Sequence, residues 1–262
     1  MAAFDGQVVL AVFAHPDDES LACGGTLARL VDSGARVVIM CATHGELSAE
    51  RTGRDEALGR ARACELTAAA TALGVQEVIL LNHRDGHVRW AEVTTFSAEL
   101  VLFMRTRRPA AVLTFDEDGL YWHPDHIAIC EATTSAIDAM GDEGPALYYV
   151  TMPPGQMRRV LDVWDHHDAG VLSPLLGVSN PDAFGVGATP PTLVIDVSAC
   201  AERKLAALKC HRTQIDGGAF ARMTAEEAAR FFDVEHFHRP PGSRVRSRHA
   251  FLDLLEMGSG VN

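Results

Sequence analysis

The sequence predicts an α/β fold: a mostly parallel β-sheet with helices on both faces, plus a smaller irregular C-terminal part. Three observations support this fold class. Through the first 150 residues, short apolar runs alternate with longer stretches of helical periodicity. The apolar runs are rich in valine, isoleucine and leucine, and they lack the polar alternation of half-exposed strands. Strand and helix that alternate in this way are typical of a doubly wound sheet.

The elements of the first part follow in order along the chain. The apolar runs predict strands at residues 8–14, 36–42, 77–81, 110–115 and 146–151. Helical periodicity predicts helices at residues 20–33, 54–73, 91–107 and 124–140. Gly34 and Gly74 follow two of these helices, where a C-terminal glycine is expected.

The C-terminal part has a looser pattern. Residues 152–191 are rich in proline and glycine, which predicts an irregular segment that shapes substrate access. A strand is predicted at 192–197, a helix at 200–214 and a short helix at 224–232, opened by Thr224 with Glu227 three positions on. We see no repeat or linker. A single domain over residues 1–262 is therefore expected, with its core in 1–150 and a substrate-shaping part in 151–262.

Composition argues against several classes of protein. The formal net charge of −12 disfavours a nucleic-acid partner, because phosphate binding needs clusters of lysine and arginine. No apolar stretch approaches the ~20 residues of a membrane helix, and the N-terminus lacks the pattern of a signal peptide. The six cysteines are scattered without a CxxC pair, as in proteins of a reducing compartment. We expect a cytoplasmic protein that binds no membrane.

Residue types that bind metals gather after the first four predicted strands. In open α/β sheets, ligands bind beyond the carboxyl ends of the strands, near the point where strand order reverses. These loops also contain several carboxylates, and they hold six of the twelve histidines: His15, His44, His83, His87, His123 and His126. A single polar loop is ordinary, so their shared content is what predicts a site.

The first group is the run from His15 to Glu19, which follows the first predicted strand. His15 and Asp18 can converge if the chain turns into a helix here, while Asp17 must then point elsewhere. One histidine and one carboxylate would hold a metal ion and the second carboxylate would handle protons. The alternative is a helix start, where acidic residues are favoured by the helix dipole; this explains the acids but leaves His15 unexplained.

The second group runs from Tyr121 to His126, between a predicted strand and a predicted helix. His123 and His126 share the three-residue spacing, and Pro124 suits a first helical turn. An isolated pair of this kind is more often a surface pair, with Asp125 as a cap. If strands one and four are neighbours, as in the order 3-2-1-4-5-6, the two groups face each other.

These two motifs resemble the LmbE/PIG-L family of zinc-dependent N-acetylglucosaminyl deacetylases, and in particular its mycothiol-pathway deacetylase and conjugate amidase branch. The resemblance extends from Val8 to about Gln214 and includes weaker matches at residues 62–65, 73–75, 85–86 and 211–214. Membership implies a Rossmann-like fold and hydrolysis of an N-acyl amide on an amino-sugar conjugate. Homo-oligomers are common among its members.

The resemblance also implies roles for particular residues. The zinc ligands would be His15, Asp18 and His126, with Asp17 as the general base. Three protein ligands leave one position open, as in catalytic zinc sites, and Fe²⁺ is an alternative metal for such ligands. Further implied roles, in the oxyanion and leaving-group chemistry and in binding of the sugar, concern His123, Tyr121, Arg62 and Asp85.

Two assignments come from position in the sequence. Asp125 is expected to orient His123 and to favour its protonated form. Glu46, on the neighbouring rim, is a further candidate for binding the substrate. The ordinary structural interpretations are a surface salt bridge for Arg62, a turn former for Asp85 and a cap for Glu46.

Other functions remain open at this point. One is an amidase that cleaves a thiol-conjugated amino-sugar amide with the same metal. Another is a nucleotide-binding protein, which is disfavoured because the first strand-to-helix turn lacks a glycine-rich phosphate loop and Gly24 and Gly25 come too late. A sugar-binding relative without activity is also disfavoured, because all the metal and acid–base positions are present.

Overall fold

From a computed structural model of the chain we describe residues 4–47, 55–89, 93–165, 180–240, 252 and 255. One seven-stranded sheet organises it, in the order β3-β2-β1-β4-β5-β7-β6. The strands are β1 Val8–Phe13, β2 Arg36–Thr43, β3 Glu77–His83, β4 Ala111–Phe115, β5 Ala146–Thr151, β6 Leu193–Asp196 and β7 Val234–His238. The first five are parallel, as predicted, and β7 runs antiparallel to both of its neighbours.

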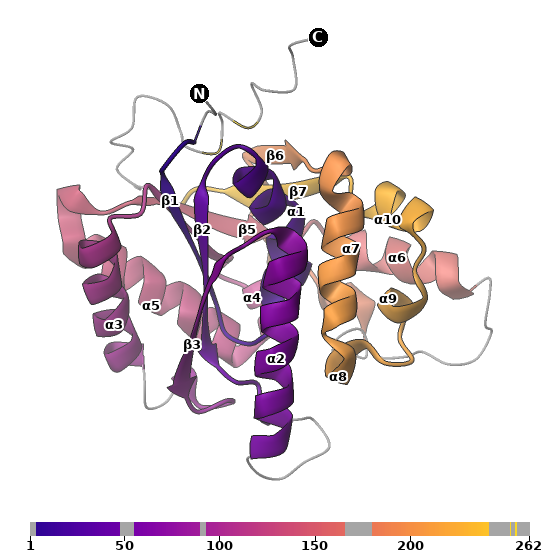
Figure 1. Cartoon of the computed structure of the whole chain (residues 1–262), viewed down its shortest axis with the longest axis horizontal. Helices are drawn as coiled ribbons and strands as arrows, with labels where there is room; N and C mark the ends of the chain where they lie inside the picture. The colour runs from indigo at the N-terminus through magenta and orange to yellow at the C-terminus, as the bar shows by residue number, and fades with distance from the viewer. Residues whose placement is uncertain are drawn as a thin grey trace.

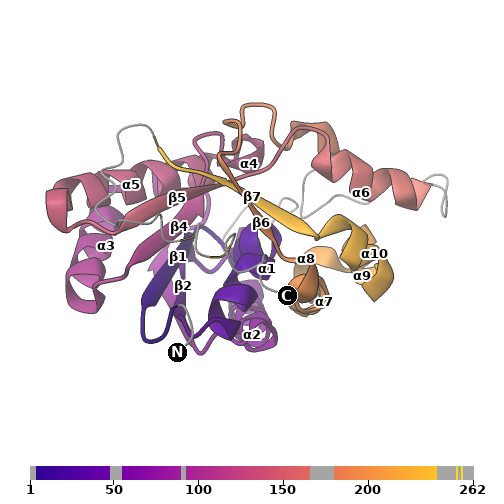
Figure 2. The ribbon, with the colours of Figure 1, turned by 90° about the horizontal axis from the view of Figure 1, so that it is seen from above.

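Helices cover both faces of the sheet (Figures 1 and 2). The longer ones are α1 Asp18–Asp32, α2 Glu56–Leu73, α3 Val93–Arg107, α5 Pro124–Met140, α6 Gln156–Asp165 and α7 Ala201–Cys210. Helices α1, α2 and α7 contact one another in one layer, and α3 packs on α5 in the other. Short helices are α4 Gly119–Trp122, α8 Arg212–Ile215, α9 Ala219–Arg222 and α10 Ala225–Phe231. The predicted α/β fold is confirmed.

The central strand β1 is buried from Val9 to Phe13 and pairs with both β2 and β4. Strand order therefore reverses between β1 and β4, and the loops after these two strands lie at the same edge of the sheet. The predicted helix ends are also present: Gly74 adopts a left-handed conformation at the end of α2, and Thr224 and Glu227 form a capping box before α10.

Two parts of the C-terminal half differ from the prediction. Residues 152–191 are not irregular throughout, because α6 occupies 156–165 directly after a Pro-Pro-Gly turn; residues 166–179 lie outside the described chain. The predicted helix at 200–214 is interrupted at His211, whose backbone leaves the helical region. Strand β7 was not predicted, and it separates β5 from β6 in the sheet.

Glu235 of β7 stabilises a break inside helix α1. The helix is interrupted at Cys23, and the carboxylate of Glu235 accepts hydrogen bonds from the amides of Gly25 and Thr26, at 2.9 and 2.7 Å. Lys204 of α7 donates to the same carboxylate at 2.6 Å, and both side chains are buried. A side chain at Gly25 would lie 2.7 Å from Val197, so only glycine allows this close approach.

Replacing Glu235 by alanine is expected to lower the free energy of unfolding by about 3–5 kcal/mol, because it leaves a buried ammonium and two amides without an acceptor. Denaturant titration measures this loss. The matched control is Glu226→Ala, which removes an exposed glutamate paired with Arg230 and should change little. Equal effects of the two substitutions would contradict the structural role of Glu235.

His238 and Asp116 form a buried ion pair between β7 and the end of β4, with 2.7 Å from Nε2 to Oδ1. Burial opposes both charges, yet the pairing raises the pKa of His238 and, with backbone N–H donors, lowers the pKa of Asp116. Because the pKa of His238 is raised in the fold, its protonated form stabilises the fold below the ordinary pKa of 6.5. Because the pKa of Asp116 is lowered, its ionised carboxylate stabilises the fold above the ordinary pKa of 3.8.

The destabilisation caused by His238→Gln is therefore expected to be larger near pH ~5.5 than near pH ~9, where the histidine loses its proton. Denaturant unfolding of both proteins at the two pH values measures the difference. Asp116→Asn should abolish this pH dependence, and adding His238→Gln to it should cost little more. A pH-independent effect of His238→Gln would show that the ion pair is not its cause.

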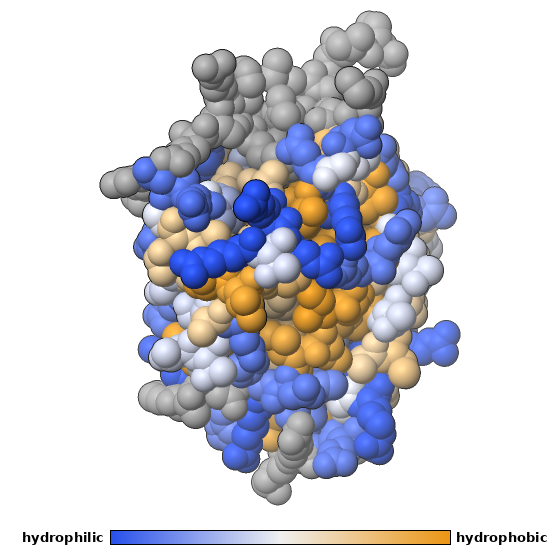
Figure 3. Space-filling view, turned by 60° about the vertical axis from the view of Figure 1, so that its left-hand side comes forward, coloured by the Kyte–Doolittle hydropathy of each residue, from blue (hydrophilic) through white to orange (hydrophobic). Residues whose placement is uncertain are grey.

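The side of the molecule that carries α3 and β3 has an apolar area among charged residues (Figure 3). Strand β3 lies at the edge of the sheet, and its residues 78–81 are half-buried aliphatics. Leu102 of α3 is 69% exposed. The homo-oligomer that the family resemblance implies stays a prediction, and this surface is where it can be probed. Among the described residues, no helix is long and apolar enough to cross a membrane.

Candidate active site

The two sequence motifs meet at the carboxyl edge of the sheet, as the strand order predicted. The first motif leaves β1 and enters α1, and the second joins β4 to α5. The rings of His15 and His123 lie 4.8 Å apart between centroids, and those of His123 and His126 lie 4.5 Å apart. Residues more than a hundred positions apart in sequence therefore line one site.

The three predicted metal-binding side chains converge on one point. His15 Nδ1 lies 3.4 Å from Asp18 Oδ2 and 3.3 Å from His126 Nε2, and His126 Nε2 lies 3.1 Å from Asp18 Oδ1. Tetrahedral zinc with bonds of about 2.0–2.2 Å separates neighbouring donor atoms by about 3.3–3.6 Å. These donor atoms therefore have the types and the spacing that suit zinc.

The second nitrogen of each histidine is oriented by the protein. His126 Nδ1 lies 3.0 Å from the Gly119 carbonyl oxygen, and His15 Nε2 lies 3.1 Å from Asp85 Oδ1 and 3.5 Å from Asp125 Oδ2. Such partners fix the tautomer of a metal ligand and raise its basicity. Gly119 has a φ of +59°, and a side chain there would lie 2.9 Å from the Cβ of His126.

Two other groups of donor atoms lie within 4.8 Å of one another among the described residues. One combines His15 and His126 with His123, and the other combines His15 with Asp85 and Asp125. The first would use His123 Nδ1 or Nε2, but Nδ1 already accepts the backbone N–H of Asp125 at 3.2 Å. The second group would bind an ion through His15 Nε2, the nitrogen that faces Asp85 and Asp125. Both groups share His15 with the predicted set, which stays a prediction.

Asp17 is placed apart from the three donors, as its predicted role requires. It occupies the N-cap position of α1, yet its side chain makes no capping hydrogen bond within the described chain. Its Oδ1 instead lies 3.2 Å from Arg62 Nη2. Burial, which the Arg62 guanidinium offsets only in part, raises the pKa of Asp17 to about 6. The helix-cap alternative therefore does not account for Asp17.

Asp18 has the opposite electrostatics. Burial alone would raise its pKa, but His126 and His15 hold the pKa of Asp18 well below its ordinary range. Its Oδ2 also accepts the backbone N–H of His15 at 2.8 Å. Two adjacent carboxylates thus differ in their surroundings: Asp18 stays ionised, and Asp17 exchanges protons close to neutral pH.

His123 and Tyr121 lie on the other side of the site. Burial, and then the neighbouring His126 and His15, lower the pKa of His123 to about 2. Because Nδ1 of this neutral ring accepts the N–H of Asp125, the proton is on Nε2. Burial, and then Asp18 and Asp17, raise the pKa of Tyr121 well above its ordinary value. Both groups are therefore neutral hydrogen-bond donors.

The predicted effect of Asp125 on the charge of His123 stays a prediction, and the structure gives its carboxylate other partners. Its carboxylate accepts the Gly86 N–H at 2.7 Å and lies 3.5 Å from His15 Nε2. Its backbone N–H donates to His123 Nδ1, and burial, followed by the neighbouring His126 and His15, lowers the pKa of His123 to about 2. The negative charge of Asp125 therefore lies against the Gly86 amide and the ring of His15, and not against the ring of His123.

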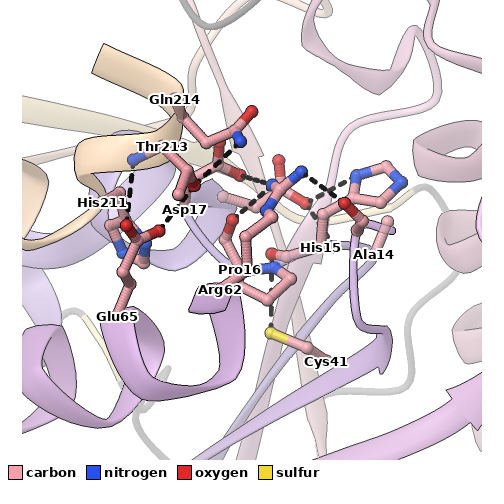
Figure 4. A network of polar contacts seen from close by, with 12 residues as sticks. Ala14, His15, Pro16, Asp17, Cys41, Arg62, Glu65, His211, Thr213 and Gln214 are labelled. Atoms are coloured by element: carbon pink, nitrogen blue, oxygen red, sulfur yellow. Dashed lines mark hydrogen bonds and ion pairs between the residues drawn. The ribbon is translucent and has the colours of Figure 1, made fainter. Parts of the chain in front are cut away.

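The three predicted substrate-binding residues are buried. Arg62 donates to the carbonyl oxygens of Pro16 and Gly45, at 2.6 and 3.0 Å, in addition to its contact with Asp17 (Figure 4). It is not a surface salt bridge, and its contacts favour positioning of Asp17 over sugar binding.

Asp85 and Glu46 connect the loops after β3 and β2. Asp85 Oδ2 accepts the N–H of Leu47 at 2.7 Å, and Glu46 Oε1 lies 3.5 Å from the Asp85 amide. Although burial would raise it, His15 lowers the pKa of Asp85 to about 2. A hollow beside Glu46 is lined by His44, Glu46, Glu56, Gly59, Arg60 and Asn82. Substrate binding by Asp85 and Glu46 stays a prediction.

One buried residue of the first motif was missed. Glu19 is fully buried and accepts the N–H of Asp17 at 3.0 Å, and its other oxygen lies 2.9 Å from His211 Nε2. In the sequence Glu19 is one more acidic residue at a predicted helix start, and no neighbouring residue indicates that it is buried and paired with His211. His83, another loop histidine, pairs with Glu99 at 2.8 Å and is also buried.

Solved structures with this fold include N,N'-diacetylchitobiose deacetylase from Pyrococcus horikoshii, with a TM-score of 0.63, 23% identity and coverage of 95% of this chain and 89% of that one. A 4-carboxy-2-hydroxymuconate hydratase from Pseudomonas putida also matches, with a TM-score of 0.61, 18% identity and coverage of 93% and 100%. These likenesses support the fold alone, since one architecture serves two reactions.

Relatives known by sequence are more similar to this chain than these solved structures are. The 1D-myo-inositol 2-acetamido-2-deoxy-alpha-D-glucopyranoside deacetylase of Acidothermus cellulolyticus is 36% identical over 87% of this chain and 87% of its own length. Residues 10–137 match the family described as PIG-L, GlcNAc-PI de-N-acetylase, and they contain both motifs of the site. The resemblance drawn from the two motifs is thereby confirmed, and the chain belongs to the PIG-L family.

Proposed function

We propose that this protein is a zinc-dependent N-deacetylase that hydrolyses the N-acetyl amide of an N-acetylglucosamine conjugate to a free amine and acetate. The observation that carries the proposal is the convergence of three side chains beside a carboxylate that takes no part in the group: His15 Nδ1, His126 Nε2 and the two carboxylate oxygens of Asp18 lie 3.1–3.4 Å from one another where they face. Family membership and deacetylase relatives support the same reaction.

His15, Asp18 and His126 would hold the zinc ion, and Fe²⁺ remains an alternative for this mixed donor set. When bound, the ion would supply the Lewis acidity needed to polarise the amide carbonyl and to acidify the attacking water. Asp85 and Asp125, behind His15, keep its ring oriented and offset the positive charge of the site.

Asp17 accepts the proton of the attacking water. A pKa of about 6 lets it be ionised at neutral pH and still hold the proton once it has been transferred. It then returns the proton to the nitrogen that leaves as the amine. Arg62 fixes the carboxylate during this exchange by its contact with Oδ1.

His123 and Tyr121 stabilise the oxyanion that develops on the carbonyl oxygen of the substrate. Both donate hydrogen bonds as neutral groups, and donors set in place before the reaction stabilise developing charge at little cost in reorganisation. The lowered pKa of His123 favours a role as hydrogen-bond donor to the oxyanion over proton transfer to the amine.

The substrate proposed is N-acetylglucosamine linked to an inositol, by analogy with the relative from Acidothermus cellulolyticus, whose name specifies such a conjugate. The hollow beside Glu46 offers space for the group attached to the sugar. No nucleic acid or membrane is proposed as a partner. Location in the cytoplasm and a homo-oligomer, both predicted from the sequence, are proposed as well.

The test is incubation of the zinc-loaded protein with a panel of N-acyl amides, with loss of the acyl group followed by mass spectrometry. The panel contains the inositol conjugate, N,N'-diacetylchitobiose, free N-acetylglucosamine and a thiol-conjugated N-acyl amino sugar. We expect the inositol conjugate to react fastest. Preferential cleavage of the thiol conjugate would favour the amidase alternative, and absence of any release would reject the proposal.

A further inference from the structure

We infer that Glu19 and His211 are positioning residues that hold the backbone of Asp17, and this inference rests on the proposed role of Asp17 as proton acceptor. Asp17 has φ 121° and ψ −28°, a conformation that L-residues rarely adopt. Such a conformation persists only where surrounding contacts enforce it, and those contacts commonly belong to a functional site.

The contact that enforces it starts at Glu19. Its Oε2 accepts the backbone N–H of Asp17, the strained residue itself, at 3.0 Å. Its Oε1 accepts the Ser20 hydroxyl at 2.6 Å and lies 2.9 Å from His211 Nε2. Both Glu19 and His211 have no exposed surface. A carboxylate buried so completely needs a partner, and the partner here comes from 192 positions away.

His211 is itself held against helix α2. The N–H and hydroxyl of Thr213 donate to the two carboxylate oxygens of Glu65, at 2.9 and 2.7 Å, and the Gln214 N–H donates to the His211 carbonyl oxygen (Figure 4). Helix α2 also carries Arg62, which holds the Asp17 side chain. Helix α2 thus supports Asp17 directly through Arg62 and indirectly through Glu65, which holds the turn that carries His211.

Glu19 could instead serve only to stabilise the start of helix α1. That ordinary role predicts lower stability after substitution but no specific loss of turnover. A positioning role predicts a loss of kcat that depends on Asp17, with substrate affinity and zinc content retained. The two roles therefore separate in a double-mutant cycle.

The first experiment replaces the buried pair by apolar residues of similar volume, Glu19→Met with His211→Leu. Removing both partners avoids an uncompensated buried charge, so the fold is expected to survive. We expect kcat on the substrate identified by the panel to fall about 100-fold, as for a small displacement of a catalytic group. KM and the zinc content per chain should stay unchanged.

Two controls belong to this experiment. His211→Gln keeps a donor toward Glu19 and should retain activity within about 3-fold of the natural enzyme. The double variant is then measured in an Asp17→Asn background, where it should lower the residual kcat by less than about 2-fold. An equal loss in both backgrounds would overturn the inference.

The proposed function and this inference fail differently. Full turnover of Asp17→Asn would reject Asp17 as proton acceptor. An inactive Asp17→Asn together with a fully active Glu19→Met, His211→Leu variant would reject only the positioning role. A variant that loses zinc or unfolds would assign the pair to stability, which also overturns the positioning role.

Thermal unfolding of the zinc-loaded whole chain gives a readout besides activity. At ordinary positions alanine is more stable than glycine, but at φ 121° the order should invert. We expect Asp17→Gly to unfold about 2–4 °C above Asp17→Ala. In the Glu19→Met, His211→Leu background this difference should disappear, because the backbone is free to relax. The same difference in both backgrounds would show that Glu19 does not enforce the conformation.

Discussion

Asp17→Asn is expected to lower kcat by about 10³-fold, within the range that general bases contribute. The amide has the same size and can still accept a hydrogen bond from Arg62, but it cannot accept the proton of the attacking water. Since Asp17 is not one of the three donor groups, zinc should remain bound in a stoichiometric amount. Steady-state kinetics and metal analysis of the purified variant measure both quantities.

The matched control is Asp138→Asn, the same chemical change on the exposed face of α5. It should leave kcat and zinc content unchanged. If Asp17→Asn turned over substrate at the natural rate, the proton would have another acceptor. Loss of zinc along with activity would instead place Asp17 among the metal ligands.

His126→Ala is expected to remove zinc and, with it, more than about 10³-fold of the turnover. His126 lies 3.1 Å from Asp18 and 3.3 Å from His15, so the substitution takes away one of three donors and the partner of a buried carboxylate. Two remaining donors cannot retain the ion against a chelator. Metal analysis after dialysis against a chelator, followed by an assay with and without added zinc, measures the effect.

Two further substitutions test whether the loss of zinc is specific to the ligand position. Asp85→Asn changes a group that contacts the back of the His15 ring, and it should weaken zinc binding about 10- to 100-fold without abolishing it. His236→Ala removes a histidine of β7 outside the site and should retain both zinc and turnover. Stoichiometric zinc in His126→Ala would favour a different donor set, such as the group that contains Asp85 and Asp125.

The order β2-β1-β4 could be predicted because the first five strands carry a local signal, apolar runs that alternate with helices. Strand β7 could not. Three residues of its sequence, Val-Glu-His-Phe-His, are polar, and two of them, Glu235 and His238, are buried with distant partners. Glu235 meets Lys204 31 positions earlier, and His238 meets Asp116 122 positions earlier. Pairing over such separations leaves no trace in a local pattern.

The site divides in the same way. That the loops of His15, Asp18 and His126 meet could be predicted, since each follows a strand whose carboxyl end must lie at one edge of the sheet, whereas the choice of these three as ligands is implied by the family resemblance and stays a prediction. The direction of Asp125 could not, because it depends on the Gly86 amide in the neighbouring loop. Nor could the partner of Arg62, which is Asp17 and two carbonyl oxygens in place of a surface acid.

The sequence by itself determined the fold class, the family and the two motifs that face each other across β1 and β4, because these depend on residue type and on spacing along the chain. Only the tertiary structure decided which neighbours make the two adjacent carboxylates differ in pKa. Asp18 lies between two histidines, whereas Asp17 is buried beside Arg62 and held through Glu19 by His211. Charge and protonation depend on neighbours in space, and for this site those neighbours come from four separate segments of the chain.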